Sequence, residues 1–204
     1  MTGTRWGKVL AALWDRATRR EGPEMTARRV AVAGGASGDV LELGFGTGAN
    51  WRYLPAGISY VGIEPDPAML SRGRAHAVQS DRAVRLVRAE AEALPFAAAS
   101  FDTVFATLTL CSVRDLDAAL KEVARVLKPG GEFRFWEHTR PQNRVAALIT
   151  DVACPAWAWA GGGCRLNRRT TEALNAEFAM EEITAFRMFL PMVLGVGRLR
   201  PEEQ

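Results

Sequence analysis

Two periodicities alternate along the chain, one typical of buried strands and the other of amphipathic helices. Short apolar runs stand at residues 40–43, 59–63, 84–88, 101–110 and 132–138. Helical spacing and helix stop signals predict helices over residues 25–33, 47–54, 66–79 and 115–128. Strands that alternate with helices in this way predict a doubly wound α/β sheet, with its ligand site at the carboxyl ends of the strands.

The last part of the chain has a different pattern. A helix is predicted over residues 170–178, and two β-rich runs follow at 180–188 and 189–199. Because only Leu190-Pro191 interrupts these two runs, they predict a final antiparallel hairpin, which brings the sheet to seven strands.

The N-terminal segment 5–19 predicts a basic helix with one apolar stripe. The stripe consists of Trp6, Val9, Leu10, Leu13, Trp14 and Ala17. In one interpretation the stripe packs on the domain, so that the helix partly covers the cofactor as a lid. In the other, the helix makes a weak contact with an anionic membrane surface.

Length and composition fit a single domain, since 204 residues that are 48% hydrophobic can bury a core of their own. We divide residues 1–204 into N-terminal helices (1–35), a cofactor-binding half (36–140) and an acceptor-side half (141–204). A net charge of +3 does not require a nucleic-acid partner. With no membrane-length apolar run and no secretory signal, we expect a cytoplasmic protein, either a monomer or a homodimer.

The segment VLELGFGTG predicts a strand that ends in a ligand-binding loop. Its three glycines, Gly44, Gly46 and Gly48, permit a sharp turn and close approach of a ligand. A nucleoside triphosphate is not predicted, because Ala49 and Asn50 stand where a phosphate loop needs lysine and a hydroxyl residue. The spacing of Gly44, Gly46 and Ala49 also fits a nicotinamide loop, so the loop alone leaves that cofactor open.

Glu42, two residues before the first glycine, favours a different cofactor. A carboxylate would repel a pyrophosphate, whereas S-adenosylmethionine has no phosphate and carries an ammonium and a sulfonium. The pattern E-x-G-x-G-x-G resembles motif I of class I S-adenosylmethionine-dependent methyltransferases. The resemblance implies cofactor contacts from Glu42, Gly44, Phe45, Gly46, Thr47 and Gly48.

Later strand ends supply the remaining predicted cofactor contacts. Glu64, twenty positions after Gly44, can accept hydrogen bonds from both ribose hydroxyls, and Pro65 can cover one face of the adenine. Glu90 can accept from the adenine amine while the Ala91 N–H donates to a ring nitrogen. The alternative for Glu90 is a solvated loop charge.

The fourth apolar run, 101–110, predicts a buried strand whose end at Thr107-Leu108 passes under the methionine part of the cofactor. An Asn/Asp-Pro-Pro-aromatic turn, typical of methyltransferases that act on exocyclic amines, is absent there. This absence argues against a nucleic-acid base as the methyl acceptor.

Three longer segments narrow the resemblance. LELGFGTGANW, FATLTLCSVRDLDAALKEVARVLKPGGEFRFWEH and PAWAWAGGGCRLNRRT are similar to the alkyl-thiol S-methyltransferases and their soluble bacterial relatives, over about residues 14–196. The resemblance implies a small-molecule acceptor, most simply a thiol or an apolar metabolite, and S-adenosylhomocysteine as product. This chain departs from the family at Phe45, where relatives have a small residue or cysteine, and at residues 191–195, where relatives have a histidine.

An amine or hydroxyl acceptor would need a base, and His138, at the carboxyl end of the fifth predicted strand, is the one obvious candidate for a base or an acceptor ligand. The alternative is that His138 only hydrogen-bonds to residues of the site. The acceptor pocket is predicted to include Cys111, as a small buried side chain rather than a nucleophile, together with Trp157, Trp159, Cys164, Arg165 and Asn167. No metal is predicted, because the three cysteines are far apart in sequence and the chain has two histidines.

Two other functions fit the same sequence. The basic N-terminal helix would suit a phospholipid or amine N-methyltransferase that works at a membrane surface. The protein could also bind S-adenosylmethionine without catalysing methyl transfer.

Overall fold

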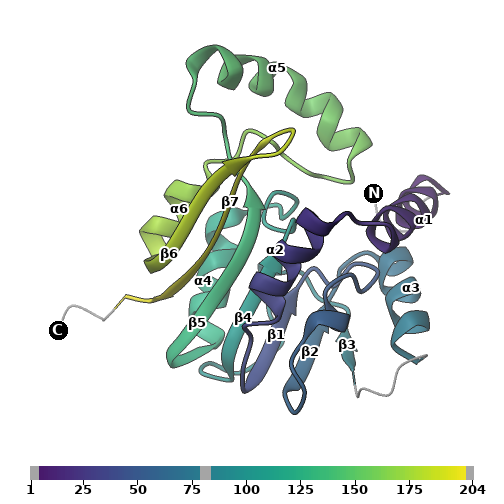
Figure 1. The fold of residues 1–204 in the computed structure, drawn as a ribbon, viewed down its shortest axis with the longest axis vertical. Coiled ribbons are helices and arrows are strands. Elements are labelled where there is room, and N and C mark those ends of the chain that lie inside the picture. The colour runs from purple at the N-terminus through teal and green to yellow at the C-terminus, as the bar shows by residue number, and fades with distance from the viewer. Residues whose placement is uncertain (1–4, 79–83, 201–204) are drawn as a thin grey trace.

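The computed structural model describes residues 5–78 and 84–200, which form one seven-stranded mixed sheet with helices on both faces (Figure 1). The strand order is β3-β2-β1-β4-β5-β7-β6. β1 to β5 run parallel to one another, and β7 is antiparallel to both β5 and β6. The strands are β1 (Asp39–Leu43), β2 (Ser59–Ile63), β3 (Arg85–Val87), β4 (Phe101–Thr107), β5 (Leu127–His138), β6 (Phe178–Arg187) and β7 (Pro191–Leu199). The predicted doubly wound sheet and its final hairpin are confirmed.

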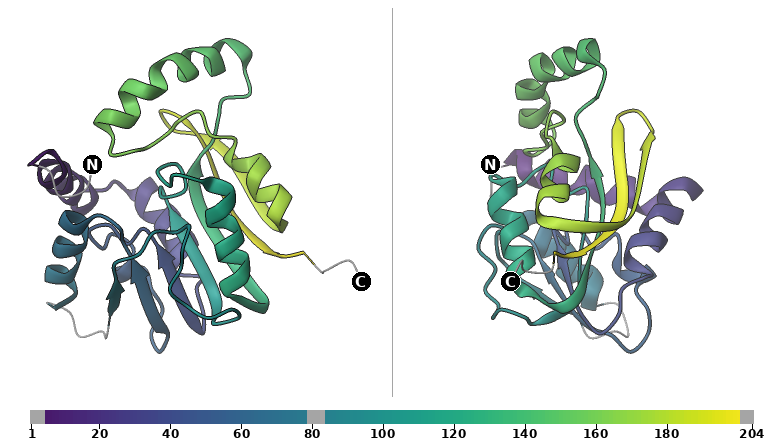
Figure 2. Two further views of the ribbon diagram at one scale, coloured as in Figure 1. Left: turned by 180° about the vertical axis from the view of Figure 1, so that it is seen from behind. Right: turned by 90° about the vertical axis from the view of Figure 1, so that its left-hand side faces the viewer.

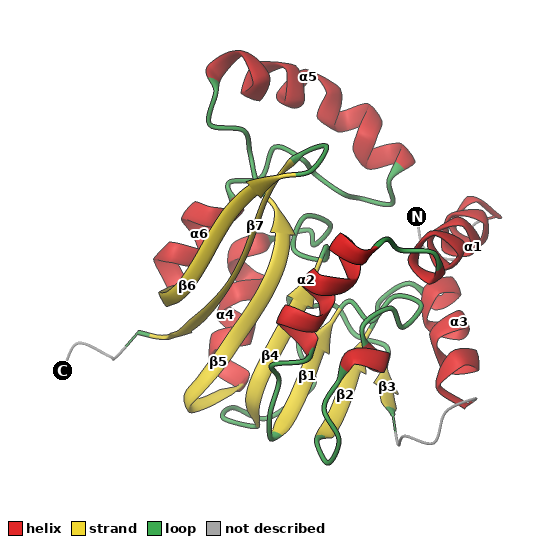
Figure 3. Cartoon of the chain, viewed as in Figure 1, coloured by secondary structure: helices red, strands yellow, loops and turns green. Residues whose placement is uncertain are grey.

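Helices cover both faces of this sheet and extend beyond its edge (Figures 2 and 3). They are α1 (Arg5–Arg19), α2 (Pro23–Ala33), α3 (Pro67–Val78), α4 (Leu116–Val126), α5 (Arg144–Ala160) and α6 (Thr170–Glu177), with one 3-10 turn, η1 (Trp51–Tyr53). Leu120 of α4 and Leu174 of α6 join the core on one face. Val32 of α2 belongs to the core on the other face, with Phe105 and Trp136. Apolar strands buried on both sides explain the nearly continuous apolar runs in the sequence.

One predicted helix is wrong and one observed helix was not predicted. Residues 47–54 form only the single turn η1, because Gly46 and Gly48 adopt positive φ angles and the chain extends again at Leu54. The helix α5 was not predicted at all. Asn143 caps it with hydrogen bonds to two backbone N–H groups, and it continues through Pro155. A proline inside an apolar segment hides helical periodicity, because proline is normally read as the end of a helix.

Other boundaries moved by a few residues. The fourth strand ends at Thr107 rather than at 110, and β5 begins at Leu127 rather than at 132. The strand predicted over residues 84–88 is shorter, and the end of the helix predicted at Gln79 lies outside the described residues. These shifts leave the strand ends that carry the predicted site at the same edge of the sheet.

α1 lies beside α3 and packs through the face opposite to the one predicted. Its buried residues are Ala11, Asp15 and Thr18, and Asp15 pairs with Arg72 of α3 at 3.6 Å. The predicted apolar stripe is largely exposed, including Trp6, Val9, Leu13 and Trp14. Most of this stripe therefore does not pack on the domain as predicted, because small and polar residues make the contact with α3, although Trp6 stacks on Trp159 of α5. Within the part of the chain that the structure describes, no helix is long and apolar enough to cross a membrane.

Candidate active site

The glycine loop turns back against the end of β4. Gly44, Gly46 and Gly48 have φ angles of +68°, +59° and +90°, which residues other than glycine rarely adopt. A Cβ at Gly44 would lie 2.3 Å from the Thr109 Oγ1 atom. That hydroxyl donates to the Leu43 carbonyl at 3.0 Å and so joins the two strand ends. The sequence requires glycine here both for the turn and for this close approach.

Phe45, the unusual residue of the loop, turns its ring into the protein core. The ring lies 6.4 Å from that of Tyr60, and its atoms stand where Cβ atoms at Gly48, Gly62 and Gly73 would fall. Three glycines in the loop, β2 and α3 therefore leave space for one large ring. Phe45 can contact a ligand only through its backbone in this arrangement, whereas the sequence predicted a cofactor contact without specifying which part of the residue makes it.

Glu64 connects the end of β2 to the glycine loop. Its Oε2 accepts from the Gly46 N–H at 2.9 Å and its Oε1 from the Asp66 N–H at 2.8 Å. Burial raises the pKa of this carboxyl to about 7, although both N–H donors act in the opposite direction. Each oxygen keeps a lone pair for a ligand hydroxyl, so the geometry is compatible with the predicted ribose contact.

Glu42 lies beneath the loop and has no exposed surface. Its Oε1 accepts from Asn50 Nδ2 at 2.6 Å, and its Oε2 accepts a short hydrogen bond from the Tyr60 hydroxyl. Burial raises the Glu42 pKa to about 7 against the effect of these two donors. These two hydrogen bonds fix the orientation of Asn50, and the contact of Glu42 with the cofactor stays a prediction.

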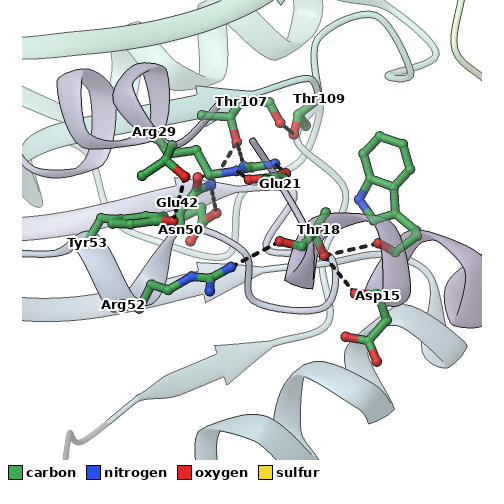
Figure 4. A network of polar contacts seen from close by, with 12 residues as sticks. Asp15, Thr18, Glu21, Arg29, Glu42, Asn50, Arg52, Tyr53, Thr107 and Thr109 are labelled. Carbon is green, nitrogen blue, oxygen red and sulfur yellow. Dashed lines mark hydrogen bonds and ion pairs between the residues drawn. The ribbon is translucent and has the colours of Figure 1, made fainter. Parts of the chain in front are cut away.

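A buried polar network around Asn50 contains residues that the sequence did not single out (Figure 4). Arg29 of α2 donates to Asn50 Oδ1 at 2.8 Å and forms a salt bridge with Glu21 at 2.6 Å. Asn50 Nδ2 also donates to the Thr107 hydroxyl at 2.7 Å. Arg29 was missed because no local pattern relates a helix before the first strand to the end of the fourth. Thr107, predicted to face the methionine part, is therefore part of this network.

Leu108 follows Thr107 in a strained backbone conformation, with a φ of +56°. Its N–H donates to the Trp136 carbonyl at 2.8 Å, which holds it beside β5. A non-glycine residue in the left-handed region costs energy and is concentrated at functional sites. Of the predicted cofactor residues, Leu108 is the one whose backbone geometry independently marks it.

The predicted adenine contacts lie on a more open loop. Glu90 is partly exposed and forms a salt bridge with Arg114 at 2.8 Å, while Ala91 beside it is buried. The carbonyl of Pro65 accepts from Arg88 at 3.2 Å. The structure places Glu90 in an exposed ion pair, as the solvated alternative expects, and leaves its adenine contact as a prediction.

α1 lies against the glycine loop on the side away from β4. His76 of α3 hydrogen-bonds through Nδ1 to the Thr47 carbonyl at 2.8 Å and contacts Arg19 of α1. Arg52 donates to the Thr18 carbonyl at 3.1 Å. A shallow cavity of about 220 Å³ lies between α1 and the loop, lined in part by Thr47, Gly48, Trp51 and His76. α1 thus stands where a lid over the glycine loop would stand.

On the acceptor side, three side chains that are distant in sequence come together. Cys111, His138 and Cys164 place one sulfur or ring-nitrogen atom each within 4.8 Å of one another. Cys164 Sγ lies 3.8 Å from His138 Nδ1. The sequence assigned all three residues to the acceptor side but did not predict that they meet, because the loop after β4, the end of β5 and the turn after α5 come together only in the folded chain.

Contacts within the cluster shift the pKa values of its three members. A hydrogen bond from Cys111 lowers the pKa of Cys164, and contacts with His138 and Trp157 act in the same direction against burial. The pKa of Cys111 is well above its usual value because of Cys164 and burial. Burial disfavours a charged His138, but its contact with Cys164 outweighs this and raises its pKa. The contacts therefore shift the two pKa values in opposite directions, downward for the Cys164 thiol and upward for the His138 imidazole.

The other predicted acceptor residues surround this cluster unequally. The Arg165 N–H donates to the Cys111 carbonyl at 2.8 Å. Asn167 instead accepts from Cys154 of α5 at 3.0 Å, so it lies under that helix. Met192, in the segment where relatives have a histidine, pairs with His138 across β5 and β7 and is buried. The acceptor side is correspondingly more apolar.

Comparison with known proteins gives a consistent result. Residues 41–135 match a family described as "Methyltransferase domain". The chain is 40% identical over 154 residues to the thiol S-methyltransferase TMT1B of Homo sapiens, which covers 71% of this chain and 62% of that protein. It is 36% identical over 128 residues to the ubiquinone/menaquinone biosynthesis C-methyltransferase UbiE of Hahella chejuensis, which covers 59% of this chain and 50% of that protein. The chain thus spans about half to three fifths of these relatives.

A solved structure shows the same fold over nearly the whole chain. The S-adenosylmethionine-dependent methyltransferase of Thermotoga maritima, described as a possible histamine N-methyltransferase, aligns with a TM-score of 0.69 at 20% identity. The alignment covers 96% of this chain and 99% of that one. At this identity the likeness concerns the fold alone.

Proposed function

The chain belongs to the class I S-adenosylmethionine-dependent methyltransferases, and on this premise we propose that it transfers a methyl group to the thiol of a small apolar acceptor. One observation carries the choice of a thiol: the His138 and Cys164 pair at the carboxyl edge of β5. The identity to thiol S-methyltransferases supports it, as does the apolar Met192 in place of a histidine.

The residues around the glycine loop fit this cofactor. Two buried carboxyls, Glu42 and Glu64, stand beside the loop, an arrangement that suits a cationic ligand and disfavours a pyrophosphate. Gly44 and its neighbours let the backbone approach closely, and Glu64 keeps free lone pairs for ribose hydroxyls. When bound, S-adenosylmethionine supplies a methyl group already activated by its sulfonium.

The protein's contribution is then to position the acceptor and exclude water. A thiol has an ordinary pKa of about 8.5, so it needs only modest help to ionise at neutral pH. We infer that His138 receives this proton and that Trp157, close to Cys164, forms an apolar wall for the acceptor. An amine or hydroxyl acceptor would require a stronger base at this position.

A screen of acceptors tests this proposal. Purified protein would be incubated with S-adenosylmethionine and an alkyl thiol, an amine, a phenol or a phospholipid, and S-adenosylhomocysteine release would be measured. We expect the thiol to be methylated fastest, and His138→Gln to lower that rate about 100-fold, within the range of general-base contributions. Faster turnover of the amine or phenol would contradict the choice of acceptor. Cofactor binding with no turnover of any acceptor would favour a non-catalytic protein.

A second candidate is methylation of a lipid or lipid-soluble acceptor at a membrane surface. Exposed apolar residues on α1 continue onto α5, where Trp6 stacks on Trp159 with centroids 6.0 Å apart. Such a surface, on a basic helix, suits an anionic lipid interface. If the protein does not bind a membrane, its three free thiols fit a reducing compartment such as the cytoplasm.

Liposome flotation distinguishes a protein that binds a membrane surface from one that does not. Leu13→Glu on α1 and Ile149→Glu on α5 should abolish binding to anionic vesicles if this surface meets lipid. Val78→Glu, at an even more exposed apolar position on α3, is the control and should not change binding. Flotation that is absent in the unmodified protein would remove the membrane candidate.

A further inference from the structure

The cluster of Cys111, His138 and Cys164 has the ligand chemistry of a soft metal ion. We propose that these side chains bind one Zn²⁺ and that its fourth coordination position receives the sulfur of the acceptor. Two thiolates and an imidazole form a donor set that zinc prefers, whereas calcium and magnesium prefer oxygen ligands. The assignment of the fourth position rests on the proposed thiol methylation, while the metal site itself does not.

The distances are close to those of a tetrahedral site. Zinc bonds of about 2.3 Å to sulfur and about 2.0 Å to nitrogen place two ligand atoms about 3.5–3.8 Å apart at tetrahedral angles. The Cys164 Sγ to His138 Nδ1 distance is 3.8 Å, and all three ligand atoms lie within 4.8 Å of one another. Side-chain shifts of up to about 1 Å bring the more distant ligand atoms to these separations.

Backbone hydrogen bonds hold the three ligands together. Glu137, fully buried next to His138, accepts through Oε1 from the Thr109 and Leu110 N–H groups at 2.7 and 2.9 Å, and so fixes the loop before Cys111. Its Oε2 is buried and has no hydrogen-bond partner. Outer residues that orient metal ligands in this way are a regular feature of metal centres.

The turn that carries Cys164 is fixed as well. Gly162 and Gly163 adopt φ angles of +70° and +104°, which allow the chain to reverse sharply after α5. The following Arg165 N–H donates to the Cys111 carbonyl at 2.8 Å. The two cysteine-bearing segments are therefore joined by their backbones, so that both thiols stay in place when a ligand arrives.

Three protein ligands leave one position open, as in catalytic rather than structural zinc sites. The site lies next to the cofactor loop, since Thr109, two residues before Cys111, hydrogen-bonds to the Leu43 carbonyl. An acceptor thiol that binds the ion loses its proton to solvent and is held as a thiolate. Its sulfur attacks the methyl carbon, the carbon bond to the sulfonium breaks, and a thioether and S-adenosylhomocysteine result. With zinc bound, His138 is a metal ligand and no longer accepts the proton of the acceptor thiol. The ion promotes the loss of that proton instead.

Cobalt substitution tests the metal site without any methyl acceptor. Chelator-treated protein would be titrated with Co²⁺ under anaerobic conditions, followed by thiolate charge-transfer and tetrahedral visible bands. We expect one ion per chain, displaced by Zn²⁺, and at least tenfold weaker binding in Cys111→Ser and in Cys164→Ser. Cys154→Ser, at the third thiol of the chain, should bind as the unmodified protein does, and calorimetry with S-adenosylmethionine checks that each variant is folded. Absent bands, or equal bands in Cys164→Ser, would overturn the site.

Mercaptoethanol then tests the fourth position. Its addition should shift the visible bands of the cobalt protein, and chelator-treated protein should methylate it at least tenfold more slowly than zinc-loaded protein. Equal rates with and without zinc would overturn the activating role while thiol methylation stands. Cobalt binding without methylation of any thiol would instead count against the proposed function and leave the metal site intact.

Discussion

The cofactor side and the acceptor side of the sheet edge are built in different ways. On the cofactor side, a carboxylate and a glycine loop lie within residues 42–64, and backbone N–H groups satisfy Glu64. On the acceptor side, Cys111, His138 and Cys164 come from three separate segments. A ligand shared by a whole family can be recognised by one local backbone motif. An acceptor that differs between relatives is met by side chains that can change independently.

The largest expected effect is on the cofactor side. Gly44→Ala must adopt a φ near +68° and place its Cβ against Thr109, so it should destabilise the protein by at least about 2 kcal/mol. Thermal unfolding should show Tm lower by about 4–8 °C, with S-adenosylmethionine binding lost in calorimetry. Gly22→Ala is the matched control, because its added Cβ meets no atom within 4 Å. Equal Tm values for the two variants would contradict the steric argument.

Glu64→Ala tests whether the cofactor side can be weakened without changing the acceptor side. Loss of the carboxylate should weaken S-adenosylmethionine binding by at least about tenfold, about 1.4 kcal/mol. The acceptor KM should stay within about twofold, because the acceptor cluster lies at other strand ends. Glu181→Ala, which removes an exposed carboxylate on β6, provides a control for net charge. Unchanged cofactor affinity in Glu64→Ala would refute the ribose assignment.

The pH dependence follows from the two buried carboxyls of the cofactor side. Burial raises the pKa of Glu42 and of Glu64 from 4.5 to about 7, so the folded protein holds protons that the unfolded chain has lost. Their contribution to stability is therefore fully present below about pH 4.5 and is lost as pH rises through 7.

A cationic ligand with ribose hydroxyls favours the ionised carboxyls, so its affinity should change in the opposite direction. We expect S-adenosylmethionine to bind about tenfold more tightly at pH 8 than at pH 6, with proton release. Calorimetry in buffers of different ionisation enthalpy measures both quantities. Equal affinities at the two pH values would show that neither carboxyl ionises on binding.

The smallest effect is expected on α5. Ile149→Ser alters an exposed side chain, so it should change the free energy of unfolding by less than about 0.5 kcal/mol and leave cofactor affinity unchanged. Urea unfolding measures the first quantity and calorimetry the second. A loss above about 2 kcal/mol would mean that α5 packs on the domain more closely than its exposed residues indicate.

Prediction from sequence succeeded where physical constraints are local. Apolar runs predicted the strands of the sheet, because a buried parallel strand needs apolar residues on both faces. It failed for residues 47–54, where glycine conformations override helical spacing, and for α5, where Pro155 stands inside a helix. On α1 the periodicity was correct, but Ala11, Asp15 and Thr18 rather than the apolar stripe face the domain.

The sequence by itself determined the sheet, the glycine turn and the identity of the residues at each strand end. Only the tertiary structure decided that the Phe45 ring enters the core, that Arg29 reaches Asn50 and that Cys164 meets Cys111 and His138. Turn conformation and strand burial depend on neighbours in the chain, so local patterns reveal them. Contacts between distant segments depend on how the sheet stacks its strand ends, and no local spacing records that.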